Sequence, residues 1–218
     1  MKNVPRLLVY LLLFSLVSAC NEMRSASKTV YLSSSELAVA TQLKPGATPL
    51  DKALANSIEQ TTKTVSYDPS YVKIAYPNGD VPVESGVCAD VIVRAFRVGG
   101  VDLQKEVHED MNGNFKKYPQ KWGAKKPDRN IDHRRVANLM TWFERRGKKL
   151  VLSDNAKDYR AGDVVAWELN NGRLHIGLIS AIKIPGTDRL AVVHNIGLGA
   201  RLEDVLFEWK IIGHYRYF

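Results

Sequence analysis

Three residues of this chain have the types and the spacing of a thiol-based hydrolase. Cys88 follows a turn that contains Gly86 and precedes an amphipathic pattern, whereas His175 and His194 lie in later segments with the pattern of strands. A thiol nucleophile needs a base that removes its proton, and an imidazole base needs a partner on its second nitrogen. The order of nucleophile, base and orienting group therefore predicts covalent chemistry at Cys88.

Two other interpretations of these residues stay open. An unpaired cysteine is commonly a buried structural residue, and a histidine in a strand is commonly a hydrogen-bonded part of the core. The same three side chains are also of zinc-ligand types, but no fourth ligand at short metal spacing accompanies them. We therefore predict neither a metal nor another cofactor.

Apolar periodicity predicts the helix that would hold Cys88. The apolar positions within residues 91–96 recur at helical spacing, and Gly99 ends the pattern. With Ser85 as the N-cap, Cys88 would lie in the first turn, where unpaired N–H groups and the helix dipole lower the pKa of a thiol. The same N–H groups are donors for an oxyanion. Further helices are predicted over residues 50–63, over residues 103–111, and from Asp132 as N-cap to Gly147.

Beyond Gly147 the pattern changes to short strands joined by hairpin turns. Helices first and an antiparallel meander afterwards is an α+β layout, with the cysteine helix packed across the sheet. The turn at Gly186 would bring His175 and His194 side by side on neighbouring strands. Whether His194 or a neighbour is the third member of the triad stays open. Strands are predicted over 163–169, 174–183, 190–194 and 211–217, with a short helical stretch at 203–209.

The N-terminus has the pattern of a bacterial export signal. Lys2 and Arg6 precede an apolar run from Leu7 to Val17, and this run is too short to cross a bilayer. The segment Val17-Ser18-Ala19-Cys20 resembles a lipobox, in which the cysteine is acylated; ordinary secretion is the alternative. Asn21 in place of Asp favours the outer membrane, facing the periplasm. The predicted organisation is a signal peptide at 1–19, a lipid-anchored tether at 20–48 and one folded domain at 49–218.

Composition describes an ordinary globular chain with a basic balance. Of the 218 residues, 45% are hydrophobic and 25% are charged, with a formal net charge of +8, which suits anionic surroundings such as wall polymers. No dense Lys/Arg stripe interleaved with aromatic residues argues for nucleic acid. If Cys20 carries lipid, Cys88 has no disulfide partner within the chain. We expect a monomer attached to the membrane through its N-terminal lipid.

Several motifs resemble known families. Four of them follow the order of the NlpC/P60 papain-like peptidases: Gly86-Val87-Cys88-Ala89-Asp90, the segment 160–167, His175-Ile176-Gly177-Leu178-Ile179 and Val193-His194-Asn195. More closely, residues from about Tyr71 to Phe218 resemble the DUF1287 family. That likeness is carried by the segments 76–82, 86–88, 108–111, 130–136, 193–197 and 213–217.

The resemblance implies an NlpC/P60-like fold with Cys88 as nucleophile, His175 as general base and His194 as orienting group. Tyr76 would match a tyrosine that assists the oxyanion site in relatives. Asp90 is a further candidate for substrate binding and could equally cap the helix. The usual Asp-Cys-Ser-Gly is replaced around Cys88, and the insert at 102–154 is larger than usual, so the family's specificity for γ-D-glutamyl bonds is not carried over.

Together these features predict a lipid-anchored cysteine amidase or endopeptidase of the cell envelope. Its substrate would be the peptidoglycan stem peptide or another envelope amide, cleaved through an acyl-enzyme. One alternative is acyl transfer on the same scaffold. The other is a non-catalytic envelope-binding lipoprotein that keeps Cys88 in its core.

Overall fold

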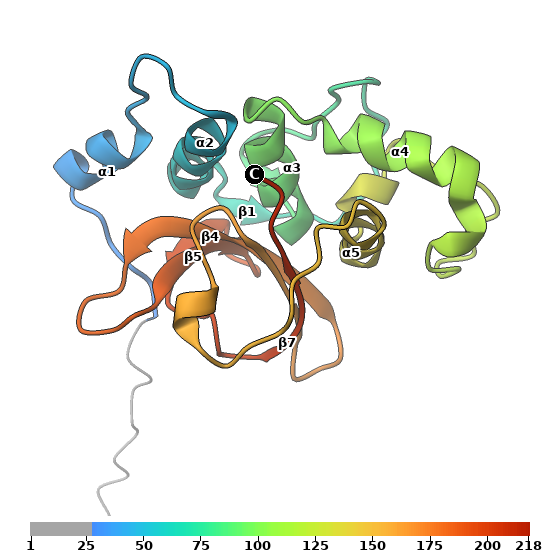
Figure 1. Ribbon diagram of the computed structural model, residues 1–218. Coiled ribbons are helices and arrows are strands. Elements are labelled where there is room, and N and C mark those ends of the chain that lie inside the picture. The colour runs from blue at the N-terminus through green and yellow to red at the C-terminus, as the bar shows by residue number, and fades with distance from the viewer. Residues whose placement is uncertain (1–27) are drawn as a thin grey trace, which may run out of the picture.

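The computed structural model describes residues 28–218, which form a layer of helices on one face of an antiparallel sheet (Figure 1). The predicted signal peptide and Cys20 lie outside the described residues. The helices are α1 (Ser34–Thr41), α2 (Pro49–Lys63), α3 (Cys88–Val98), α4 (Leu103–Asn114) and α5 (Val136–Arg145), with short 3-10 turns at Phe115–Lys117, Asp132–Arg134 and Ala156–Asp158. No helix of this part of the chain is both long and apolar enough to span a bilayer.

The main sheet has five antiparallel strands in the order β6-β5-β4-β3-β7. A separate parallel pair, β1 with β2, brings the segment after α2 to the turn that precedes α3. The strands are β1 (Ser66–Tyr67), β2 (Ser85–Gly86), β3 (Val164–Glu168), β4 (Leu174–Lys183), β5 (Leu190–Asn195), β6 (Ala200–Glu203) and β7 (Lys210–Tyr215). The predicted α+β layout, with helices packed on an antiparallel sheet and Cys88 at a helix start, is confirmed.

Alternate residues of β3 point to two apolar clusters on opposite faces of the sheet. Val164 and Ala166 belong to the cluster beneath α3 and α5, together with Ile92, Phe96 and other buried residues. Val165 and Trp167 belong to a second cluster on the far face. That face is covered by the segment 204–209, where the Leu206 carbonyl accepts a hydrogen bond from the Trp167 indole at 3.0 Å. Both faces of the sheet are therefore closed.

The start of α3 differs from its prediction. Ser85 is not the N-cap, because it lies in β2, and the helix begins at Cys88 with Val87 as the cap residue. The Val87 N–H donates to the Asp90 carboxylate at 2.6 Å. The carboxylate at the third helical position therefore supplies one half of a capping box, and Val87 has no side-chain acceptor for the other half. Similarly, Asp132 lies in a 3-10 turn, and α5 begins only at Val136.

Two further expectations are wrong. The helical stretch expected at 203–209 is instead the end of β6 followed by turns. The segment 28–48, expected to be part of a tether, contains α1 and pairs with the sheet through a bridge between Thr29 and Glu203. Val30, Leu32 and other apolar residues of this segment pack on the domain, and burying them is why the segment is folded onto the domain.

Candidate active site

The Cys88 thiol lies at the first position of α3 and touches β4. The backbone N–H groups of Ile176, in β4, and of Ala89 and Cys88 act on this thiol and lower its pKa, Ile176 the most. Only 5% of Cys88 is exposed. The Ile176 nitrogen is bonded to the carbonyl carbon of His175, so the sulfur lies beside the residue that carries the predicted base.

A buried ion pair holds the turn that presents Cys88. Both oxygens of Asp90 accept hydrogen bonds from Arg134, each at 2.9 Å, and the two side chains are only 3% and 2% exposed. Arg134 also donates to the carbonyls of Ser70 and Asp68. Both oxygens of Asp90 are therefore occupied within the protein, and the carboxylate orients the cysteine turn.

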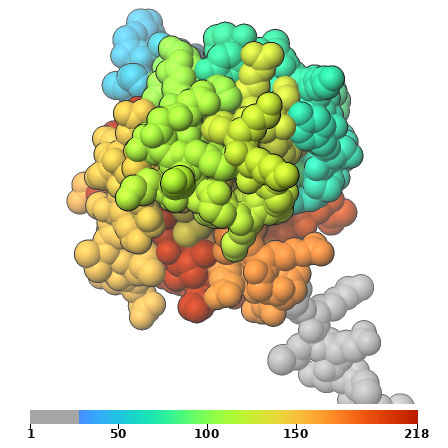
Figure 2. Space-filling view, turned by 90° about the vertical axis from the view of Figure 1, so that its right-hand side faces the viewer, coloured from blue at the N-terminus to red at the C-terminus, as the bar shows by residue number. Residues whose placement is uncertain are grey.

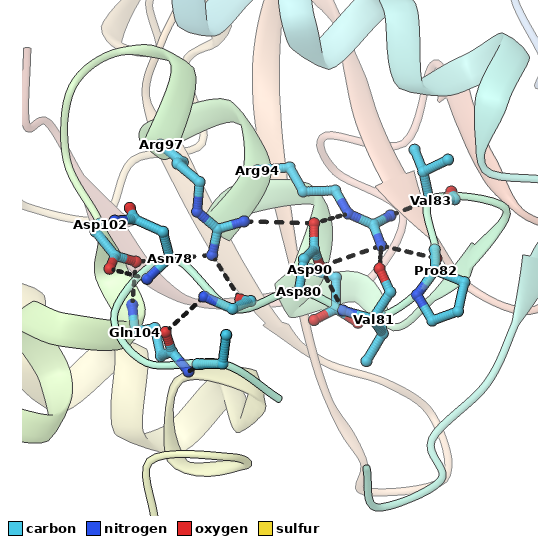
Figure 3. Close-up of polar contacts among 12 residues, drawn as sticks. Asn78, Asp80, Val81, Pro82, Val83, Asp90, Arg94, Arg97, Asp102 and Gln104 are labelled. Atoms are coloured by element: carbon cyan, nitrogen blue, oxygen red, sulfur yellow. Dashed lines mark hydrogen bonds and ion pairs between the residues drawn. The ribbon is translucent and has the colours of Figure 1, made fainter. Parts of the chain in front are cut away.

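A second arginine fixes the loop before the turn. Arg94, from the middle of α3, forms an ion pair with Asp80 at 2.9 Å and donates to the carbonyls of Val81 and Pro82 (Figure 3). It also donates to the Ser85 carbonyl at 2.9 Å. One guanidinium thus supplies hydrogen-bond donors to three carbonyls of the loop. The segment 80–86 is thereby tied to the helix that it precedes.

Asn195 joins the sheet to the same turn, and sequence reasoning missed it. Its amide donates to the Gly86 carbonyl at 2.9 Å and to the Ser66 carbonyl at 3.1 Å. Asn195 directly follows His194 at the end of β5. The strand that carries His194 is therefore hydrogen-bonded to the turn that precedes Cys88.

The two histidines form the middle of a buried polar chain. His175 Nε2 lies 2.9 Å from His194 Nδ1, and His194 Nε2 lies 3.0 Å from Glu203 Oε2. The other Glu203 oxygen accepts from the Thr29 hydroxyl at 2.9 Å. Sequence reasoning missed Glu203, because its segment was expected to be helical. Because β6 pairs with β5, Glu203 lies diagonally across the two strands from His194.

His175 stacks on Trp167, its cross-strand partner, at 5.8 Å and meets the edge of Trp209 at 5.7 Å. Among the described residues there is no hydrogen bond between Cys88 and either histidine. The structure thus brings His175, His194 and Glu203 into one chain and brings Cys88 to the adjacent backbone.

Burial controls the protonation of the thiol and the base. It raises the pKa of Cys88 to about 12, against the lowering action of the Ile176 N–H. Burial, and next the neighbouring His194, lower the pKa of His175 to about 3, while Glu203 acts to raise it. The pKa of Glu203 is lowered, chiefly by its hydrogen bond with His194. The thiolate expected from the helix dipole is therefore not formed in this closed conformation, because loss of water outweighs the dipole.

Tyr76 lies away from Cys88. Its ring packs against His108 at 5.2 Å and beneath the Arg129 guanidinium at 5.5 Å. Tyr67, in β1, is a tyrosine whose pKa depends on Cys88. Burial is the largest cause of its raised pKa, and the negative charge of an ionised Cys88 is the next. No sequence signal distinguished Tyr67, since a two-residue strand has no detectable periodicity.

Comparison with known proteins identifies the family. The sequence model described as "Domain of unknown function (DUF1287)" matches residues 54–217. The chain belongs to the DUF1287 family. A relative from Escherichia coli (strain K12), "Uncharacterized protein YijF", is 58% identical over 161 residues, which are 73% of this chain and 78% of the relative. No solved structure matches this DUF1287 chain. Within residues 28–218, no group of three or more His, Cys, Asp or Glu side chains is arranged to hold a metal ion.

Proposed function

We propose that this protein is a cysteine amidase or endopeptidase of the cell envelope, with an NlpC/P60-like fold. Two observations support the proposal: the hydrogen-bonded chain His175–His194–Glu203, and the action on the Cys88 thiol of the backbone N–H of Ile176, the residue after His175. A carboxylate on the outer histidine fixes its tautomer, and the next nitrogen fixes the inner ring in turn. This arrangement leaves His175 Nδ1 as the nitrogen that can serve the thiol.

The proposed reaction is acyl transfer to sulfur followed by hydrolysis. As the Cys88 S–C bond forms, the thiol proton passes to His175 and the carbonyl oxygen becomes an oxyanion. N–H groups at the start of α3 stabilise that charge. Collapse breaks the C–N bond, and His175 returns the proton to the leaving amine. Water, deprotonated by His175, then attacks the thioester carbonyl; the C–S bond breaks, the carboxylic acid product leaves, and His175 returns the proton to the Cys88 sulfur.

The proposed substrate is the peptidoglycan stem peptide, on an enzyme anchored by lipid at Cys20 in the outer membrane. The lipobox-like N-terminus and the basic balance of the chain support this location. An envelope lipoprotein lies within reach of an abundant amide polymer.

The decisive experiment is mass spectrometry of muropeptides incubated with the full chain in detergent. We expect new amide-cleavage products with the wild type and none with Cys88→Ala at equal circular dichroism. Identical muropeptides in both samples would remove the wall as the substrate.

The burial of Cys88 favours a second candidate, acyl transfer, because a closed site keeps water from the thioester. Adding a free amine acceptor to the same digestion separates the two reactions: a transferase forms the new amide at the expense of the hydrolysis product.

A further inference from the structure

The loop after α4 carries an unusual concentration of positive charge. Residues 116–129, here called the basic loop, contain Lys116, Lys117, Lys121, Lys125, Lys126 and Arg129, with Asp128 as the acidic residue among them. Figure 2 shows the face of the molecule where α4 and the following segment, in green to yellow, meet the teal segment before α3.

A cavity of about 480 Å³ opens between these segments, which is a size typical of small-ligand sites. Lys126, Arg129 and Arg135 line it together with Trp122 and Tyr71. Within residues 28–218, neither Lys126 nor Arg129 has a carboxylate within salt-bridge distance. Two cations at the cavity are thus available to an anion.

Asp128 keeps its negative charge, but three cations of the cavity lining, Lys126, Arg129 and Arg135, outnumber it. Its oxygens are occupied within the loop. They accept hydrogen bonds from the Tyr71 hydroxyl at 3.1 Å and from the backbone and side chain of Asn130 at 2.9 and 3.0 Å. Those bonds hold Tyr71 on the cavity wall. The acidic residue is therefore structural, and the net field of the cavity stays positive.

The Trp122 side chain is exposed on the surface and is not packed in the core. It is 54% exposed, and the Arg135 guanidinium lies 4.3 Å from its ring centroid, a cation–π contact that orients the indole. Its φ is 61°, in the left-handed region where bulky residues are rare and cost energy. An oriented, exposed aromatic face beside unpaired cations is suited to a ligand that combines a ring with negative charge.

The cavity also has an unpaired polar atom in its wall. His108 Nδ1 is buried and has no hydrogen-bond partner among the described residues, and His108 lines the cavity. A buried ring nitrogen without a partner costs free energy unless a ligand or water satisfies it.

We infer that this cavity binds an acidic sugar: the ring packs on Trp122, and its carboxylate or phosphate is bound by Lys126 and Arg129. Tyr71 and Arg134 connect the cavity to the cysteine turn, since Arg134 donates to both the Ser70 carbonyl and Asp90. That the cavity anchors the glycan end of a wall substrate rests on the proposed function, whereas the binding of an acidic sugar does not.

The test compares two sugars that differ by one lactyl group, which carries a carboxylate. Ligand-observed NMR titrates the full chain in detergent with N-acetylmuramic acid and, separately, with N-acetylglucosamine, which lacks the lactyl carboxylate. We expect the acidic sugar to bind at least about tenfold more tightly, and the difference to shrink in high salt. N-acetylglucosamine 1-phosphate forms a third arm: tighter binding than the carboxylate sugar assigns the ligand to phosphorylated envelope sugars rather than to the wall glycan.

Matched variants locate the site. Trp122→Ala, Lys126→Gln and Arg129→Gln should each weaken binding by about three- to tenfold, whereas the exposed controls Tyr31→Ala and Lys52→Gln should not change it. Equal affinity for both N-acetyl sugars, no binding by any sugar, or an unchanged affinity in all three cavity variants would overturn the inference. The same titration on Cys88→Ala separates this result from the chemistry: sugar binding there, with no amide cleavage by the wild type, refutes only the proposed function.

Discussion

The buried pair of Asp90 and Arg134 offers the sharpest test of how the cysteine turn is held. In Asp90→Asn the Arg134 charge loses its carboxylate partner and keeps only neutral acceptors, the new amide oxygen and the Ser70 and Asp68 carbonyls, in a site where the guanidinium side chain is 2% exposed. Breaking one partner of such a pair costs about 3–5 kcal/mol. For a domain of this size that corresponds to a fall in Tm of roughly 6–20 °C.

Urea unfolding of four proteins measures the effect: wild type, Asp90→Asn, Arg134→Met and the double variant. We expect the loss of unfolding free energy in the double variant to be smaller than the sum of the two single losses by about 2 kcal/mol or more, because the double variant removes both charges together. Lys157→Gln is the matched control. Its pair with Asp188 is 70% and 60% exposed, so its loss should change stability by less than about 1 kcal/mol. Additive single losses, or an Asp90→Asn loss as small as the control's, would refute the reasoning.

Three other outcomes follow from buried titratable groups. Burial raises the pKa of Cys88 to about 12, so iodoacetamide should label it about a thousandfold more slowly at pH 7 than an ordinary thiol. Mass spectrometry of quenched time points measures the labelling rate. A rate that levels off below pH 7 would contradict this prediction. Burial lowers the pKa of His133 to about 3, so the unfolded chain binds its proton below about pH 6.5 while the folded chain does not, and stability falls with pH from there to about 3; a His133→Leu variant should show a flatter urea-midpoint profile over that window, and an unchanged slope would exclude the histidine as the cause. The pKa of Glu203 is lowered, so its stabilising effect is present above the carboxyl's unfolded pKa and is lost as pH falls through the folded value; wild type and Glu203→Gln should differ in unfolding free energy at pH 7 and converge in acid.

Elements with a long periodic pattern could be predicted from the sequence. The strand expected at 174–183 has those bounds in β4, and the helix expected at 50–63 is α2 with one more residue at its start. In both, apolar spacing and burial agree over ten residues or more. The same is true of the hairpin that places His175 beside His194, because the hairpin turn is local in sequence.

Contacts that join distant short segments could not be predicted. Glu203 reaches His194 only because the four residues of β6 pair with β5, and a segment of that length has no decisive period. The N-terminal Thr29 contacts the same carboxylate from 174 positions away. Likewise, the effect of burial on Cys88 depends on how closely β4 and α3 pack, whereas the sequence shows only the helix dipole that acts in the opposite direction.

The protonation states of the resting site set a condition on any covalent chemistry. Burial raises the pKa of Cys88 and lowers that of His175, so it opposes the transfer of the thiol proton to the imidazole in this conformation. The resting pair is therefore a neutral thiol and a neutral imidazole. Catalysis requires that substrate or water enter beside the sulfur, which would lower the pKa of Cys88 and raise that of His175 together. Glu203 acts on the second of these through His194, so its charge should matter more for the rate of acylation than for the binding of substrate.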